Sequence, residues 1–217
     1  MNDPFTKAKL QQKYPTEQVY TVPFLKGKVI PDGYTPVQLS DKEILKTMSS
    51  WQQGGRFIMR YDAEGNNSLL QLIPYTLVMS TDRTKVFVAK RTAGDSRLVS
   101  KFSLGFGGHI NPCDTQYVIL SAAARELEEE LDLKRKTMPG FIGYVRDTVS
   151  NTSEHLGFVF VLLADHVTVR EKDNMEGTWM DLDDLVDHYY KFESWSKYLI
   201  DYLFVVSTED RLFGEEL

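Results

Sequence analysis

The segment from Thr115 to Leu131 predicts a helix that is apolar on one face and strongly acidic beside that face. At about 100° per residue, its apolar side chains gather within roughly 60° of Leu127. These residues are Leu120, Ala124, Leu127 and Leu131. We therefore expect this face to be buried.

Four glutamates follow one another closely near the end of this predicted helix. Glu130, Glu126 and Glu129 fall about 60°, 100° and 160° from Leu127 on one side, and Glu128 falls on the other. Like charges one turn apart repel by a few tenths of a kcal/mol, and acids near a helix C-terminus oppose its dipole. One interpretation is a solvated acidic surface. The other is a site for a hard divalent cation, which needs carboxylate oxygens that converge on one point.

Strand-like runs lie on both sides of the predicted helix. They are Gln71 to Ser80, Lys85 to Lys90, Phe141 to Asp147 and Leu156 to Asp165. A glycine-rich loop at 104–108 precedes the helix, and helical patterns follow at 182–190 and 193–206. Strands, a helix, then further strands and helices indicate an α+β fold.

The first 69 residues differ from the rest, because prolines and glycines interrupt them and long apolar runs are missing. A capping-box pattern, Ser40 with Glu43, predicts one short helix there. We expect a small N-terminal extension at 1–69 and a main domain at 70–217.

Charge and composition argue against several classes of partner. The formal net charge is -6, whereas proteins that bind nucleic acid polymers usually carry a basic surface. The one cysteine, Cys113, excludes an internal disulfide and a zinc site with several cysteines. The apolar runs have strand length rather than membrane length, and the first residues lack the apolar core of a signal peptide. We expect a cytoplasmic protein with no nucleic acid polymer and no membrane as partner.

The stretch from Gly108 to Leu133, GHINPCDTQYVILSAAARELEEELDL, resembles the Nudix box, G-x5-E-x7-R-E-U-x-E-E-x-G-U with U aliphatic. The matching positions are Gly108, Arg125, Glu126, Leu127, Glu129, Glu130 and Leu133. Three positions depart from the pattern. Asp114 replaces the first glutamate, ten residues instead of seven separate it from Arg125, and Asp132 replaces the glycine after the helix. Aspartate tolerates a left-handed cap better than most residues other than glycine, so we expect the change at Asp132 to cost little stability.

The resemblance implies a Nudix-type mixed β-sheet sandwiched between helices. It also implies hydrolysis of the diphosphate bond in a small organic diphosphate, such as a nucleoside derivative, with Mg²⁺ or alternatively Mn²⁺. Carried over by position, Glu126, Glu129 and Glu130 are metal ligands, together with the carbonyl of Gly108. Glu129 and Glu130 are catalytic through the metal, and Arg125 is an orienting residue at i,i+4 from Glu129.

Further site residues are expected outside the box. Arg91, Arg97, Lys101 and His109 are candidates for binding substrate phosphate, although each of the basic residues could equally be a solvated surface charge. Among the aromatic residues, Phe106, Tyr117 and Trp179 could stack on a base or sugar, with core packing as the alternative for each. Many family members take another glutamate from a loop outside the box, and Glu176 is our candidate for this catalytic base, with Glu154 as its rival.

Two other functions stay open at this point. A Nudix-fold ligand sensor with weak or no catalysis would account for Asp114, Asp132 and the longer spacer. An isomerase acting on an isoprenoid diphosphate is the third interpretation. Because family members are often dimers, a homodimer is a further expectation.

Overall fold

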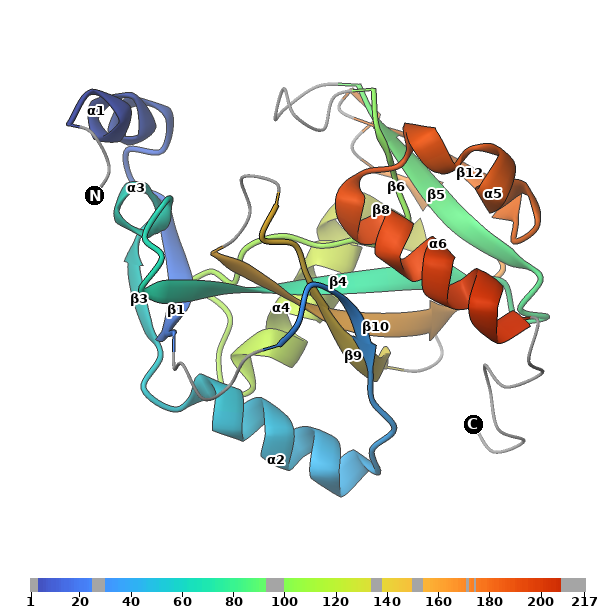
Figure 1. Cartoon of the computed structure of the whole chain (residues 1–217), viewed down its shortest axis with the longest axis horizontal. Coiled ribbons are helices and arrows are strands. Elements are labelled where there is room, and N and C mark those ends of the chain that lie inside the picture. The colour runs from blue at the N-terminus through green and yellow to red at the C-terminus, as the bar shows by residue number, and fades with distance from the viewer. Residues whose placement is uncertain are drawn as a thin grey trace.

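The computed structural model shows a mixed β-sheet with helices packed on both faces (Figure 1). It describes residues 4–24, 30–92, 100–133, 138–149, 154–170, 172–173 and 175–207. Within these residues, no helix is both long and apolar enough to cross a membrane.

The main path of the sheet has the strand order β12-β5-β4-β10-β9-β2. Its strands are β12 (Met175–Asp181), β5 (Lys85–Arg91), β4 (Leu69–Met79), β10 (His155–Leu163), β9 (Gly140–Arg146) and β2 (Gly33–Pro36). The central pair β4 and β10 is parallel, from Gln71 opposite His155 to Met79 opposite Leu163, and the other neighbours are antiparallel. Strands outside this path are β1 (Gln18–Pro23), β3 (Arg56–Met59), β6 (Phe102–Ser103) and β7 (Gly105–Phe106), and β8 (Leu131–Leu133) pairs separately with β11 (Val167–Val169).

The helices largely follow the sequence pattern. They are α1 (Pro4–Lys13), α2 (Asp41–Gln52), α3 (Arg60–Ala63), α4 (Val118–Glu130), α5 (Asp184–Asp187) and α6 (Ser194–Ser207), with a 3-10 turn at Tyr189–Lys191. The predicted helix at 182–190 is therefore only α5 followed by this turn. Helix α4 begins at Val118 rather than Thr115, because Gln116 has a positive φ of 60° that no α-helix accommodates.

Alternate residues of β4 and β10 face different helices, which is the reason these strands are buried on both sides. Leu72, Phe158 and Phe160 pack in one cluster with Ile119 and Ala122 of α4. The intervening residues Ile73, Leu77 and Val159 pack in another cluster with Leu199, Ile200 and Leu203 of α6. The expected mixed sheet between helices is confirmed, with α4 and α6 on different sides of β4 (Figure 1).

The N-terminal segment contributes strands to the same sheet. Strand β1 pairs with β4 and β3, and β2 pairs with β9. Val19 and Met48 from this segment are fully buried. The extension thus covers part of the core.

Candidate active site

A cavity of about 600 Å³ lies where the glycine-rich loop, α4, the sheet and the start of α6 meet. Glu126 and Glu130 of α4 line it, together with Gly107, Gly108 and His109 of the loop. The box residues and the glycine loop are therefore parts of one concave surface, which is the usual form of a small-molecule site.

The buried face of α4 differs from the face that hydrophobicity predicted. Leu127 and Leu131 are buried as expected, but Leu120 and Ala124 are only partly buried. The buried residues of α4 are Val118, Ile119, Ala122, Ala123, Glu126, Leu127 and Glu130. The helix is thus rotated toward its glutamates, because two of them face the cavity instead of solvent.

The glutamates of α4 divide into a buried pair and an exposed pair. Glu126 and Glu130 have relative exposures of 9% and 7%, whereas Glu128 and Glu129 are exposed. Burial raises the pKa of Glu126 above its ordinary value, although Arg125 opposes this effect. A buried carboxylate with a raised pKa is energetically costly as an anion, and a bound cation would relieve that cost.

Arg125 donates hydrogen bonds to several residues of the box. Its guanidinium donates two hydrogen bonds to Asp114, of 3.0 and 2.9 Å, and others to Glu126 at 2.7 Å and Glu129 at 3.0 Å. It also donates to the carbonyl of His109 at 2.9 Å. The expected i,i+4 pair with Glu129 is present, and the longer spacer still lets Asp114 reach Arg125 in a bidentate pair.

The glycine loop leaves no room for side chains. A Cβ added at Gly107 would lie 1.9 Å from the carbonyl oxygen of Pro74, and one added at Gly108 would lie 2.8 Å from both carboxylate oxygens of Glu126. Gly108 therefore brings backbone directly against a carboxylate that the resemblance assigns to the metal.

Asp132 does not adopt the left-handed conformation by which we explained its tolerance in place of glycine. Helix α4 passes at Leu131, with φ -124° and ψ 143°, straight into β8, where Asp132 pairs with Thr168. Extended backbone does not require glycine, which explains why the change from the family pattern is tolerated.

The oxygen donors at this wall suit magnesium. The buried carboxylate of Glu126 lies beside Gly108, and the buried Glu130 lines the same cavity. Glu129 is one helical turn from Glu126. A set made of carboxylates and a backbone carbonyl is the chemistry that Mg²⁺ and Mn²⁺ prefer. These residues fit the implied metal.

Three of the four residues expected to bind phosphate line the cavity, namely Arg91, Lys101 and His109. The fourth, Arg97, lies outside the described residues. Arg91 also lies 3.6 Å (Nη2 to Oε1) from Glu130. Among the described residues, the lining includes four Arg and Lys side chains, Arg60, Arg91, Lys101 and Lys197, against three carboxylates, Glu126, Glu130 and Glu193.

His109 lies between the box and the N-terminal segment. Burial, Arg60 and His155 together lower the pKa of His109 well below its ordinary value. Its ring is therefore neutral at pH 7 and offers hydrogen bonding rather than charge to a ligand.

The aromatic residues of the cavity are different from those proposed from sequence. Phe106 and Trp179 pack on Phe87 with ring centroids 5.9 and 5.3 Å apart, and Tyr117 is exposed. The aromatic side chains that line the cavity are Tyr75, Phe102, Phe192 and Trp195. Trp195 belongs to an apolar pattern at helical spacing, so it was indistinguishable in the sequence from an ordinary core residue.

Glu193 is a cavity residue that the sequence did not reveal. Its carboxylate accepts hydrogen bonds from the hydroxyl of Tyr75 at 2.6 Å and from the backbone N–H groups of Trp195 and Ser196 at 2.7 and 2.8 Å. It also accepts one from the Ser196 hydroxyl. These bonds satisfy N–H groups at the start of α6 and fix that end of the helix at the cavity.

The expectation that Glu176 lies in a loop is wrong. It lies in β12, opposite Lys90 of β5, and is exposed. Its rival Glu154 is buried and accepts a hydrogen bond from the N–H of Gly65 at 3.2 Å. Neither belongs to the described lining of the cavity, and pairing with β5 restrains the backbone at Glu176.

Comparisons with known proteins agree with this architecture. The model of the Nudix domain matches residues 73–203. Protein YmaB of Bacillus subtilis (strain 168) is 32% identical over 181 residues, covering 77% of this chain and 87% of that protein. The crystal structure of Tm1382, a protein assigned to the Nudix hydrolases, has a TM-score of 0.72 at 27% identity, covering 88% of this chain and 100% of that one.

A more distant structure shares the fold alone. It is the bifunctional NMN adenylyltransferase/ADP ribose pyrophosphatase of Francisella tularensis in complex with AMP and a manganese ion. It has a TM-score of 0.50 at 17% identity, and the match covers 62% of this chain and 41% of that one. The match to the family model and the likeness to YmaB establish that this chain belongs to the Nudix family.

Proposed function

We propose that this protein hydrolyses the diphosphate bond of a small organic diphosphate, such as a nucleoside derivative, with Mg²⁺ or Mn²⁺ as cofactor. One observation carries the proposal: two buried box carboxylates, Glu126 and Glu130, share a cavity with basic and aromatic side chains. Acid, base and aromatic surface are the three features that a metal-assisted site for such a substrate requires.

The box residues would hold the metal at one wall. Glu126, Glu129, Glu130 and the carbonyl of Gly108 are the proposed ligands. Arg125 holds two of them, Glu126 and Glu129, in register, and it is itself held by Asp114. When bound, divalent ions lower the pKa of water, neutralise phosphate oxygens and orient the substrate.

The other walls would position the substrate. Arg91 and Lys101 lie where a diphosphate extending from the box would meet them, and basic side chains bind phosphate oxygens strongly. Trp195 and Phe102 offer aromatic faces for a base or another planar group. The closed wall at Gly107 and Gly108 keeps the phosphate end near the carboxylates.

The test is a phosphate-release screen over organic diphosphates with Mg²⁺ or Mn²⁺. The panel should contain nucleotide sugars, dinucleoside polyphosphates, ADP-ribose, oxidised nucleotides and coenzyme A derivatives. Release of phosphate or a monophosphate that depends on metal and is lost in Glu130→Gln supports the proposal.

Two outcomes would point elsewhere. Tight binding of a panel member with no product at any metal concentration would favour the alternative, a ligand sensor on this fold. Rearrangement of an isoprenoid diphosphate with its diphosphate retained would favour an isomerase.

A further inference from the structure

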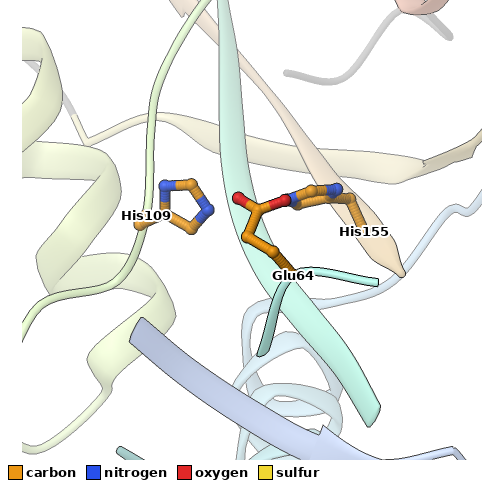
Figure 2. A group of neighbouring side chains, drawn as sticks. All are labelled: Glu64, His109 and His155. Atoms are coloured by element: carbon orange, nitrogen blue, oxygen red, sulfur yellow. The ribbon is translucent and has the colours of Figure 1, made fainter. Parts of the chain in front are cut away.

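Three side chains from distant parts of the sequence converge at the end of the cavity nearest the N-terminal segment (Figure 2). Glu64 directly follows α3, His109 directly follows the glycine loop, and His155 is the first residue of β10. One carboxylate oxygen and one nitrogen from each imidazole all lie within 4.8 Å of one another. In Figure 2 the two rings lie on either side of the Glu64 carboxylate.

We propose that Glu64, His109 and His155 form a second metal site, which binds Zn²⁺ or a similar first-row transition ion. Two imidazole nitrogens and a carboxylate oxygen are borderline donors that suit Zn²⁺, Co²⁺ and related ions, unlike the all-oxygen box. Ligand atoms of a tetrahedral zinc site lie about 3.3 Å apart. Small side-chain rotations would bring the three donors to that spacing.

The surroundings of the His109 ring support a metal ion as its ligand partner. Its Nε2 is buried and has no hydrogen-bond partner among the described residues. Its other nitrogen, Nδ1, lies 3.9 Å from Oε1 of Glu17. A buried imidazole nitrogen without a partner is costly, and an ion bound at Nε2 would remove that cost. Glu17 lies beyond hydrogen-bond distance of Nδ1, and a small approach would let it accept from Nδ1–H and orient the ring as in other histidine ligands.

The neighbouring charge also permits a cation. Arg60 is close, but it is paired with Glu17 at 2.9 Å and with Oε1 of Glu64 at 3.0 Å. Two carboxylates against one guanidinium leave the group with a net negative charge. The positive charge of Arg60 is therefore neutralised by Glu17 and Glu64, and it would repel a divalent ion less than an unpaired arginine would.

The site opens toward the cavity, since both histidines line it with Glu126 and Glu130. Three protein ligands leave at least one coordination position for a group from the cavity, as in catalytic rather than structural zinc sites. A ligand in the cavity could thus contact two metal sites, the all-oxygen site of the box and the site formed by Glu64, His109 and His155. This inference does not depend on hydrolysis, because metal binding is measured without substrate.

The experiment is a Co²⁺ titration of the full-length protein in excess Mg²⁺, followed by visible absorption and by calorimetry. We expect one Co²⁺ per chain with absorption bands typical of nitrogen ligation. His109→Ala, His155→Ala and Glu64→Gln should each weaken binding at least about 100-fold, the upper end for residues that only support a ligand. The matched control is His166→Ala, because His166 is exposed outside the cluster. Glu129→Gln should keep the Co²⁺ signal and so separates this site from the box.

A second measurement uses the wild-type protein, so its result does not depend on whether a variant folds. The chain has four histidines. Zn²⁺ should shift the ¹⁵N imidazole signals of His109 and His155 in NMR spectra, while the signals of His166 and His188 stay unchanged. Four unchanged histidines at saturating Zn²⁺, or Co²⁺ binding that both histidine variants retain, would overturn the proposal.

Discussion

Replacing Gly108 by alanine tests whether the glycine loop sets the position of a metal ligand. The added Cβ would lie 2.8 Å from both carboxylate oxygens of Glu126, whereas ordinary contact begins at 3.4 Å. The carboxylate must therefore retreat by about 0.6 Å, roughly three times the tolerance of a metal–ligand distance. Displacements near 1 Å can cost about 100-fold in rate. We expect kcat to fall about 10- to 100-fold, equivalent to roughly 1.4–2.7 kcal/mol, and Mn²⁺ affinity to fall with it.

Stability should change much less than activity, because the clashing atoms are the end of a flexible side chain. A cost near 1 kcal/mol, the low end for overpacking, is expected. The control is Gly140→Ala, where the nearest atom to an added Cβ is 4.0 Å away. Calorimetric Mn²⁺ titration and thermal unfolding give both quantities without a known substrate.

A double variant decides whether the effect acts through Glu126. In a Glu126→Gln background, Gly108→Ala should add less than about twofold, because the two changes damage the same ligand. Wild-type Mn²⁺ affinity in Gly108→Ala, or full additivity in the double variant, would refute the reasoning.

Three further predictions concern the box, the outer carboxylate and acid stability. Glu129→Gln and Glu130→Gln should each lower kcat by about 100-fold or more while the protein stays folded, and Mg²⁺ should raise the wild-type Tm by mass action; unchanged rates or no shift in Tm would count against these ligands. Glu193→Gln should lower kcat or raise KM more than Glu176→Gln or Glu154→Gln, because of the three only Glu193 belongs to the described lining of the cavity; a loss of kcat of about 100-fold in Glu176→Gln, with loss of the acidic limb of the pH–rate profile, would restore the assignment made from sequence. Hydrogen bonds from Ser80 and Thr84 lower the pKa of Asp82 to about 2, so their stabilisation is present above the unfolded value of about 3.9 and is lost as the pH falls toward 2; Asp82→Asn should flatten Tm against pH over this range, and an unchanged curve would contradict it.

Local spacing explains what the sequence could predict. The i,i+4 pair of Arg125 and Glu129 depends only on helix geometry, and it is present at 3.0 Å. The apolar runs at 71–80 and 156–165 also predicted the strands β4 and β10, although nothing in the sequence indicated that the two would pair in parallel. The box residues that line the cavity also lie together through local spacing, since one helix and one loop position them.

Side-chain environment explains what the sequence could not predict. A pattern based on hydrophobicity counts Glu126 and Glu130 as polar, so it placed the buried face of α4 on Leu120 and Ala124 instead. Glu193 and Trp195 come to the cavity only because α6 begins there, and no spacing in the sequence encodes that junction. Glu176 was expected in a loop, but it lies in β12, because the pairing of β12 with β5 is a long-range interaction that local patterns do not determine.

The N-terminal segment has to be understood as part of the sheet that carries the cavity. Strand β4 is almost wholly buried along its length, and a strand buried on both faces needs cover on both. At its beginning β4 also needs a partner along its edge, and β1 supplies it by pairing with β4 from Leu69 to Gln71. Removing this segment would expose a strand edge and apolar core together. The part that Arg60 plays at the cavity therefore has to be measured by single substitutions in the full chain, where a change in KM reports on the substrate and not on a damaged sheet.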